Sequence, residues 1–181
     1  MNTEQVILVN EKDEELGAMD KMQAHRQGIL HRAFSIFIFD KTGRMLIQQR
    51  SAQKYHGALL WSNACCSHPF LGESIESAGQ RRLLEELGIT VPLKSVFSFL
   101  YKTEVENDLI ENEFDHVLTG IYEGELKINP TEVASFCYIS MSQLKESIQD
   151  YPYKFTYWFR LALPKIEEWW VNQYGDLSKS D

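Results

Sequence analysis

The chain has 181 residues, of which 44% are hydrophobic, and a formal net charge of −8 at pH 7. This length and composition predict one globular domain over residues 1–181, with enough apolar chain for a substantial core. The acidic balance argues against nucleic acid or an anionic membrane surface as a partner, because both attract clustered Lys and Arg.

The predicted elements alternate between strands and helices. A strand over 5–9 is followed by a polar turn over 13–17 and a short helix over 20–25. Apolar runs over 33–39 and 45–49 predict two strands joined by a hairpin through residues 40–43. A helix over 74–87 should stop at Gly88, since glycine favours the left-handed conformation that ends helices.

The second half of the chain predicts three strands, over 96–101, 113–122 and 135–139. Ser142 is predicted to cap a helix, and an aromatic helix over 155–170 should be interrupted or kinked at Pro164. A polar tail covers 175–181. This order favours an α/β fold in which helices flank a mixed sheet.

The compartment follows from segments and residues that the chain lacks. No apolar run approaches the ~20 residues of a membrane span, and the N-terminus has neither the basic start nor the apolar stretch of a signal peptide. The three cysteines, with Cys65 and Cys66 adjacent, do not suit a disulfide framework. We therefore expect a cytoplasmic protein with no membrane partner, present as a monomer or a weak dimer.

Chemistry-bearing residues concentrate between positions 65 and 89. The segment Cys65-Cys66-Ser67-His68-Pro69 precedes the helix that carries the carboxylates Glu85 and Glu86, with Glu73 just before it. Adjacent residues splay about 100° apart on a helix, so only one of Glu85 and Glu86 needs to point into a site. A thiol, an imidazole and carboxylates in one stretch suggest acid–base chemistry on a metal-bound, phosphorylated substrate.

The spacing from Glu73 through Arg81 to Gly88 and Ile89 resembles the Nudix box, a loop–helix–loop that binds divalent cations on a diphosphate. Two positions depart from the box. Ser67 stands where it begins with Gly, and Arg82 replaces a metal-binding carboxylate of the hydrolases. The exchange adds an anion clamp and removes a metal ligand, which makes hydrolysis the less favoured reaction. The resemblance implies a Nudix-type α/β/α sandwich.

Other motifs resemble the type I isopentenyl-diphosphate isomerases, a family of the Nudix superfamily, from about residue 21 to residue 158. The matching residues are His25, His31, Trp61-Ser62-Asn63, Cys66, Ser67-His68-Pro69 and Glu111-Asn112-Glu113. The resemblance implies an isomerase of isoprenoid biosynthesis that interconverts isopentenyl diphosphate and dimethylallyl diphosphate. Two alternatives are a Nudix hydrolase of a diphosphate and a catalytically silent ligand-binding or metal-storage protein.

The resemblance implies a five-ligand metal site made of His25, His31, His68, Glu111 and Glu113. Three imidazoles with two carboxylates indicate a six-coordinate Mn²⁺, Mg²⁺ or Zn²⁺ ion more than they indicate a tetrahedral, thiolate-rich structural zinc site. The i, i+2 spacing of the two glutamates places them on one face of a strand. The remaining histidines, His56 and His116, are interpreted as structural.

The family pattern places the catalytic thiol at Cys66, two residues before His68, and leaves Cys65 as a small apolar filler. A hydrolytic Cys66–His68 nucleophile pair is a rival reading that lacks an orienting group. In the isomerase reading, Glu113, near the metal and the Tyr101 phenol, protonates the alkene, and Cys66 removes the second proton. A useful base at neutral pH requires a lowered thiol pKa, through nearby cations or His68.

The resemblance also assigns the substrate contacts. Lys21, Arg50, Lys54 and Arg82 would hold the diphosphate, although solvated surface charge is the usual fate of Lys and Arg. Trp158 would shield the carbocation with its π face, the alternative being core packing. Mg²⁺ bound to the diphosphate would be held by Glu86 and the Cys66 backbone carbonyl.

Overall fold

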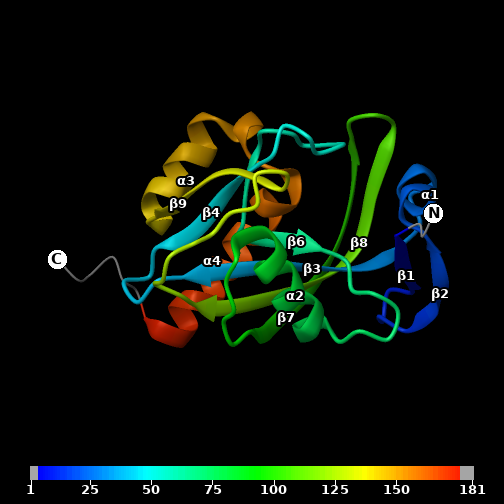
Figure 1. The fold of residues 1–181 in the computed structure, drawn as a ribbon, viewed down its shortest axis with the longest axis horizontal. Helices are drawn as coiled ribbons and strands as arrows, with labels where there is room; N and C mark the ends of the chain where they lie inside the picture. The colour runs from blue at the N-terminus through cyan, green and yellow to red at the C-terminus, as the bar shows by residue number, and fades with distance from the viewer. Residues whose placement is uncertain (1–3, 176–181) are drawn as a thin grey trace.

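Strand β3 (His31–Phe39) is the centre of the fold and pairs with four other strands. In the computed structural model, which describes residues 4–175, it lies between β1, β4, β6 and β8 in one mixed sheet (Figure 1). Its pairing with β8 is parallel, and its other pairings are antiparallel. The remaining strands extend the sheet from these partners: β2 from β1, β5 and β9 from β4, and β7 from β8.

The strands have the following bounds: β1 Gln5–Val9, β2 Glu15–Asp20, β4 Met45–Arg50, β5 Trp61–Ser62, β6 Cys65–Ser67, β7 Lys94–Val105, β8 Leu109–Ile121 and β9 Val133–Ile139. The helices are α1 Lys21–Gln27, α2 Ile75–Leu87, α3 Met141–Asp150 and α4 Tyr157–Tyr174, with a short 3₁₀ turn at Pro152–Lys154.

Side chains of β3 alternate between two cores. Phe34 and Ile36 enter the cluster that includes Leu83 of α2, whereas Phe37 enters the cluster that includes Phe159 of α4. Because successive side chains of a strand point to opposite faces, a strand that is buried at nearly every position, as β3 is, must be covered on both sides. The predicted α/β/α sandwich is confirmed, with α2 on one face of the sheet and α3 and α4 on the other.

Several predicted turns and helix ends agree with the structure, because residues close by in the sequence determine them. Asp40 Oδ1 accepts hydrogen bonds from the backbone N–H groups of Thr42 and Arg44, 2.9 Å away in both cases, which closes the predicted hairpin between β3 and β4. Ser74 caps α2, and Gly88 ends it with a φ of 67°. Alanine at Gly88 would place its Cβ 2.9 Å from the Lys127 carbonyl oxygen, so glycine is required there on two grounds.

Other boundaries differ from the prediction. Helix α3 is capped by Ser140 and not by Ser142, because Ser140 and Gln143 form a reciprocal capping box. Helix α4 begins at Tyr157 and continues through Pro164 without interruption as far as Tyr174. The predicted turn over 13–17 is mostly strand, since β2 begins at Glu15, and α1 extends to Gln27. Of the predicted tail over 175–181, only Gly175 is among the described residues, and 176–181 lie outside them.

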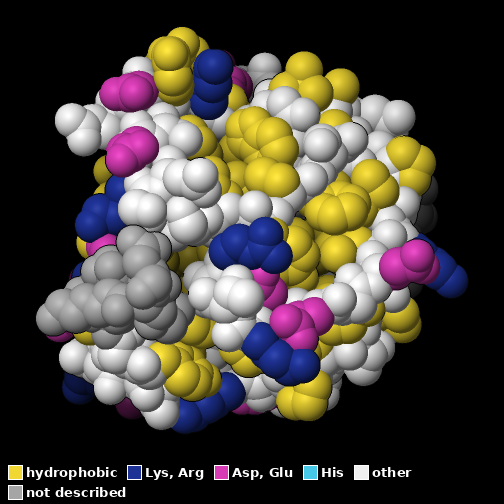
Figure 2. Space-filling model, turned by 90° about the vertical axis from the view of Figure 1, so that its left-hand side faces the viewer, with side chains coloured by type: hydrophobic (Ala, Val, Ile, Leu, Met, Phe, Trp, Pro, Cys, Tyr) yellow, Lys and Arg dark blue, Asp and Glu magenta, His cyan; other side chains and the backbone are white. Residues whose placement is uncertain are grey.

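One surface of the molecule is shown in Figure 2, at the end where α4 finishes. Basic and acidic side chains are interspersed there among hydrophobic ones. Among the residues that the structure describes, no helix has both the length and the apolar character needed to cross a bilayer.

Candidate active site

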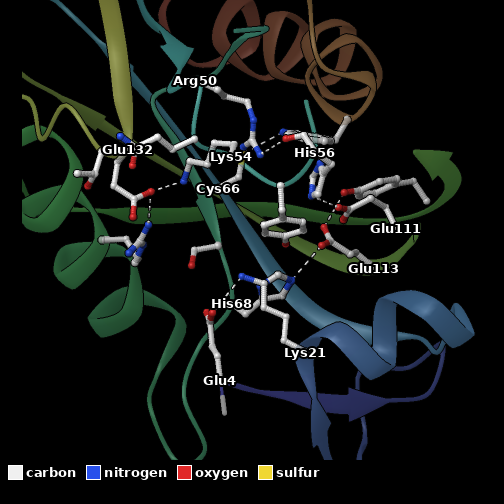
Figure 3. A pocket seen from close by; sticks show the side chains of 17 residues that line it. Glu4, Lys21, Arg50, Lys54, His56, Cys66, His68, Glu111, Glu113 and Glu132 are labelled. Carbon is white, nitrogen blue, oxygen red and sulfur yellow. Dashed lines mark hydrogen bonds and ion pairs between the residues drawn. The ribbon is translucent and has the colours of Figure 1, made fainter. Parts of the chain in front are cut away.

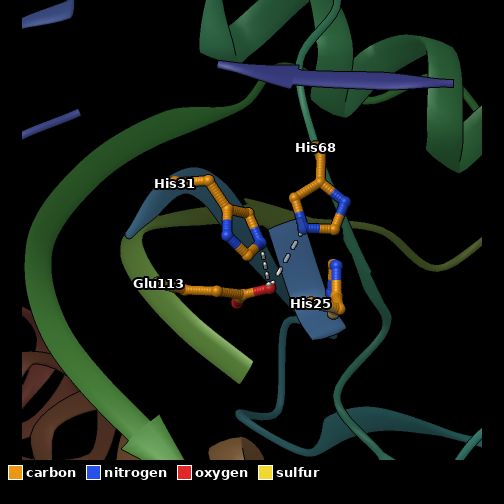
Figure 4. A group of neighbouring side chains, drawn as sticks. All are labelled: His25, His31, His68 and Glu113. Atoms are coloured by element: carbon orange, nitrogen blue, oxygen red, sulfur yellow. Dashed lines mark hydrogen bonds and ion pairs between the residues drawn. The ribbon is translucent and has the colours of Figure 1, made fainter. Parts of the chain in front are cut away.

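Four buried side chains from four separate segments converge on one point (Figure 4). His25 comes from α1, His31 from the start of β3, His68 from the loop after β6, and Glu113 from β8. The parallel register sets His31 directly beside Glu113. One ligand atom of each residue lies within 4.8 Å of the others, a spacing that suits a single bound cation.

Backbone hydrogen bonds fix the orientation of two of these imidazoles. His25 Nδ1 donates to the Lys21 carbonyl over 2.7 Å, and His31 Nδ1 donates to the Ile29 carbonyl over 2.8 Å. The lone pair of each ring is then on Nε2, and both Nε2 atoms are buried without a hydrogen-bond partner among residues 4–175. Such oriented, unpartnered imidazole nitrogens are the usual ligands of a divalent metal, so the residues fit the predicted ion.

The protonation state of His68 also suits a metal ligand. Burial, together with the neighbouring His31 and Lys21, holds the pKa of His68 well below its usual value, so the ring is neutral. Its Nε2 lies 3.0 Å from Glu113 Oε1. Neutral imidazole is the form that coordinates metals.

Glu111, the predicted fifth ligand, lies at the rim of this cluster. Its Oε1 is 3.6 Å from His25 Nε2 and 2.8 Å from His56 Nε2. The structure therefore gathers four of the five predicted ligands tightly and places Glu111 against His56. Sequence reasoning left His56 out of the site; it comes from the loop between β4 and β5, and nothing in its spacing links it to β8. His116, by contrast, bonds Asp13 over 2.9 Å.

Glu113 is also half of a carboxylate–phenol pair. Tyr101 on β7 stands opposite Glu113 on β8, and its hydroxyl donates to Glu113 Oε2 over 2.6 Å. Burial opposes the charged form of this carboxylate, but the neighbouring His31 and the hydrogen bond from Tyr101 contribute to lowering the pKa of Glu113 to about 2. Burial raises the pKa of Tyr101 well above its usual value. The pair is thus an ionised carboxylate that accepts from a neutral phenol.

The two cysteines have different surroundings. Cys65 is fully buried in the core cluster under α2, whereas Cys66 lines the site cavity. The Cys66 thiol donates to Asn63 Oδ1 over 3.1 Å, and Trp158 Nε1 donates to its sulfur over 3.1 Å. Ser35 Oγ lies 3.5 Å from the same sulfur. Among the described residues no hydrogen bond joins Cys66 to His68, so the rival nucleophile pair has no support.

The predicted lowering of the thiol pKa is wrong for this arrangement. Burial raises the pKa of Cys66 to about 12, and the nearby Asp115 adds to the rise. The hydrogen bonds that Cys66 makes with Ser35 and Asn63, and the charge of Arg50, oppose the rise without reversing it. Since His68 is neutral and bonded to Glu113, it supplies no charge to the thiol. Cys66 is a protonated thiol at neutral pH.

Four cationic side chains line the same cavity of about 420 Å³: Lys21, Arg50 and Lys54, which Figure 3 labels, and Arg82. Three of them already meet carboxylates. Lys21 is 3.2 Å from Glu4, Arg82 is 3.4 Å from Glu132, and Lys54 also pairs with Glu132. An incoming anion would exchange with these carboxylates.

Arg50 differs from the other three cations. Its Nε and Nη2 donate to the backbone carbonyls of Gly57 and His56 over 3.0 and 2.9 Å. Its guanidinium also lies over the Trp158 ring, 5.2 Å from the centroid. Arg50 therefore shapes the loop and the aromatic wall in addition to lining the cavity. Trp158 is both a core residue and a wall of the cavity.

The glutamates Glu73, Glu85 and Glu86, at the two ends of α2, have separate surroundings. Glu86 is buried and is bonded by Arg82 and by Gln48 Nε2, the latter over 3.0 Å. Glu85 is largely exposed and accepts from Arg82 over 2.7 Å. Glu73 accepts from Arg81 Nε over 2.9 Å. Only Glu86 turns inward, as the splay of adjacent helix residues requires.

Comparison with known proteins shows which protein class the chain belongs to. A family model described as the NUDIX domain matches residues 29–159. The fold resembles that of DR0079 from Deinococcus radiodurans, with a TM-score of 0.68 and 22% identity, over 81% of this chain and 90% of that one. The class defined by fold and site is therefore a Nudix-domain protein.

Relatives narrow the class further. The chain is 46% identical to a protein named isopentenyl-diphosphate Delta-isomerase from Serratia proteamaculans, over 92% of this chain and 96% of the relative. It is 44% identical to isopentenyl-diphosphate Delta-isomerase 2 from Photorhabdus laumondii, over 91% of this chain and 96% of the relative. The chain belongs to the isopentenyl-diphosphate Delta-isomerases of the Nudix family. An isomerase is favoured over both the hydrolase and the catalytically silent alternative.

Proposed function

We propose that the chain interconverts isopentenyl diphosphate and dimethylallyl diphosphate, with Glu113 and Cys66 as the two groups that exchange protons with carbon. The observation that carries the proposal is that the Cys66 thiol and the Tyr101–Glu113 pair line one cavity, beside Trp158. Moving a double bond by one position adds a proton at one carbon and removes a proton from the carbon two bonds away. Two separate acid–base groups are needed, and the cavity contains them.

In this proposal Cys66 and Glu113 together hold one exchangeable proton, and the residue that carries it at rest decides which direction of the reaction can start directly. The raised pKa of Cys66 and the lowered pKa of Glu113 put that proton on the thiol in the free site. If Glu113 protonates the terminal carbon of isopentenyl diphosphate, the proton must first reach Glu113. The reverse reaction, in which Cys66 protonates dimethylallyl diphosphate, starts from the resting arrangement.

Protonation of an alkene creates tertiary carbocation character that water would capture. Trp158 is 5% exposed and lines the cavity, so it presents an aromatic wall and limits the access of water. Arg50 already lies over this ring, which supports the ring as a surface that accepts positive charge. We assign to Trp158 the stabilisation of the developing cation.

The metal and the diphosphate would occupy adjacent parts of the site. His25, His31, His68 and Glu113 would hold Mn²⁺, Zn²⁺ or Mg²⁺, with Glu111 at the rim. A bound divalent ion supplies positive charge that stabilises negative charge beside it. The substrate diphosphate, carrying Mg²⁺, would meet Lys21, Arg50, Lys54 and Arg82. Glu86, the inferred ligand of that Mg²⁺, would have to share its carboxylate with Arg82.

The setting is part of the same proposal. We infer a cytoplasmic enzyme that acts alone or as a weak dimer on a small-molecule substrate, with no nucleic acid or membrane partner. All three cysteines are free, which suits a reducing compartment. Light scattering after gel filtration at several concentrations would test the assembly state.

A direct assay tests the reaction. Purified protein given isopentenyl diphosphate and Mg²⁺ should form an acid-labile allylic product without releasing phosphate. Release of phosphate would instead show a hydrolase, and no change in the substrate would show a binding protein. The proton assignment has its own test in D₂O with Cys66→Ala. Residual deuterium should enter the terminal carbon and not the carbon next to the CH₂–O group, and the opposite pattern would exchange the roles of Glu113 and Cys66.

A further inference from the structure

His56 has no role in the proposed proton transfer or in the four-residue cluster, yet it lies in the site. It is 6% exposed and lines the cavity. Its Nε2 lies 2.8 Å from Glu111 Oε1, whereas the imidazole of His25 is 3.6 Å from the same oxygen. Only the His56 contact is short enough for a hydrogen bond. Of the two imidazoles beside the Glu111 carboxylate, His56 is therefore the one within hydrogen-bond distance.

Both the backbone around His56 and its imidazole ring are held by neighbouring residues. Arg50 Nη2 donates to the His56 carbonyl over 2.9 Å, and Glu106 Oε2 accepts from the next backbone N–H, that of Gly57, over 3.0 Å. The imidazole meets Tyr55 edge-on, with 4.5 Å between ring centroids, and Trp158 edge-on at 5.8 Å. Backbone and ring are both restrained, so the direction of the Nε2–H bond is set before any ion arrives.

The position of Glu111 needs such a restraint. Glu111 and Glu113 are two buried carboxylates on the same face of β8, two residues apart, and like charges repel in a buried site. Glu113 is fixed by Tyr101 and His68. Glu111 has no comparable side-chain donor other than His56 within the described residues. Without that donor, the carboxylate is free to turn away from the cluster.

We propose that His56 is a positioning residue that holds Glu111 beside the metal cluster by donating Nε2–H to Glu111 Oε1. The inference rests on the metal site of the proposed function. It adds His56 as a residue that does not bind the metal but orients the predicted ligand Glu111. Groups that orient metal ligands in this way typically change metal affinity about 10- to 100-fold when they are removed. The proposal therefore predicts an effect on metal binding itself, independent of turnover.

Two substitutions separate hydrogen bonding from packing. His56→Phe keeps an aromatic ring against Tyr55 and Trp158 but has no N–H, whereas His56→Gln places an amide N–H near the position of Nε2. The matched control is His116→Gln, which changes the other histidine outside the cluster, bonded to Asp13. The probe is Mn²⁺ alone, titrated into metal-free full-length protein, with far-UV circular dichroism as the check on folding.

The expected result is that His56→Phe weakens Mn²⁺ binding by about 10- to 100-fold. His56→Gln should recover most of the affinity, and His116→Gln should bind like the wild type. Wild-type affinity in His56→Phe would overturn the role of His56, as would an equal loss in folded His56→Phe and His56→Gln. If the wild type itself fails to bind Mn²⁺ or Zn²⁺, the metal site of the proposed function fails, and the role of His56 fails with it.

Discussion

Trp158 donates its indole N–H to the sulfur of Cys66 over 3.1 Å. The residue assigned to the carbocation is therefore also a hydrogen-bond partner of the assigned acid–base thiol. Helix α4 brings Trp158 to the cavity, and β6 brings Cys66. The contact fixes the thiol against an aromatic wall, so a change at Trp158 should affect both the thiol and the cation.

Trp158→Phe and Trp158→Leu should separate these two effects. Both lose the N–H bond to sulfur, but Phe keeps an aromatic face and Leu does not. Activity should fall in the order Trp, Phe, Leu, mainly in kcat, because a cation over a desolvated ring gains roughly 2 kcal/mol, or about a thirtyfold change in rate. Equal kcat in Phe and Leu, with equal losses of stability in denaturant, would make Trp158 a core residue only.

Cys66→Ala should keep the fold and lose turnover by several orders of magnitude. Cys65→Ala should remain close to wild type in turnover and lose about 1 kcal/mol of unfolding free energy, because Cys65 fills the core under α2 and does not line the cavity. Steady-state rates and urea unfolding of the two variants provide the comparison. The assignment of the thiol would be reversed if Cys65→Ala were the inactive variant.

Much of the fold could be predicted because its signals are local. The hairpin at Asp40, the cap at Ser74 and the glycine after α2 each act within a few residues. The start of α3 was missed because two serines compete as cap, and the reciprocal bond with Gln143 selects Ser140. Helix α4 runs through Pro164, where tertiary packing of Trp158, Phe159 and Ile166 outweighs the local cost of proline.

The site was harder to predict where it depends on long-range contacts. The residues of the metal cluster were found through resemblance, and the register of β3 beside β8 brings two of them, His31 and Glu113, together. His56 and Glu132 gave no local signal, because their partners are more than 40 residues away in the chain. The direction of the Cys66 pKa shift depends on burial and on Asp115, neither of which follows from the neighbouring sequence.

Alkylation of Cys66 should report its raised pKa directly. A thiol with a pKa of about 12 is almost entirely protonated at pH 7, and only the thiolate reacts. In a Cys65→Ala, Cys137→Ser background, the rate of reaction of metal-free protein with iodoacetamide should rise about tenfold per pH unit between pH 7 and 10, without a plateau. A plateau near pH 7 would show that the thiol pKa is lowered.

Removal of metal should abolish activity without unfolding the protein. The cluster of His25, His31, His68 and Glu113 lies beside two apolar cores that do not depend on it, so a chelator should leave most of the far-UV circular dichroism intact. His31→Ala should lower the metal-to-protein ratio measured by elemental analysis. Complete unfolding of the metal-free protein would show a structural site, and an unchanged ratio in His31→Ala would remove that residue from the ligand set.

Arg82 and Glu86 should be strongly coupled in stability. Glu86 is buried and bonded by Arg82, so Arg82→Met leaves a buried carboxylate with only the Gln48 amide as side-chain donor. Breaking a buried ion pair from one side costs about 3–5 kcal/mol, and a lower value of about 3 kcal/mol is expected here because Arg82 is partly exposed.

The double variant Arg82→Met, Glu86→Gln removes the charge together with its partner and keeps an oxygen that can accept from Gln48. It should therefore be more stable than Arg82→Met alone, with a coupling of about 1–3 kcal/mol in a urea double-mutant cycle. Lys41→Met is the control, since its pair with Glu123 is exposed and should have no measurable effect. Strictly additive losses would show that Arg82 does not neutralise Glu86, and its place in the cavity would then be explained by the substrate alone.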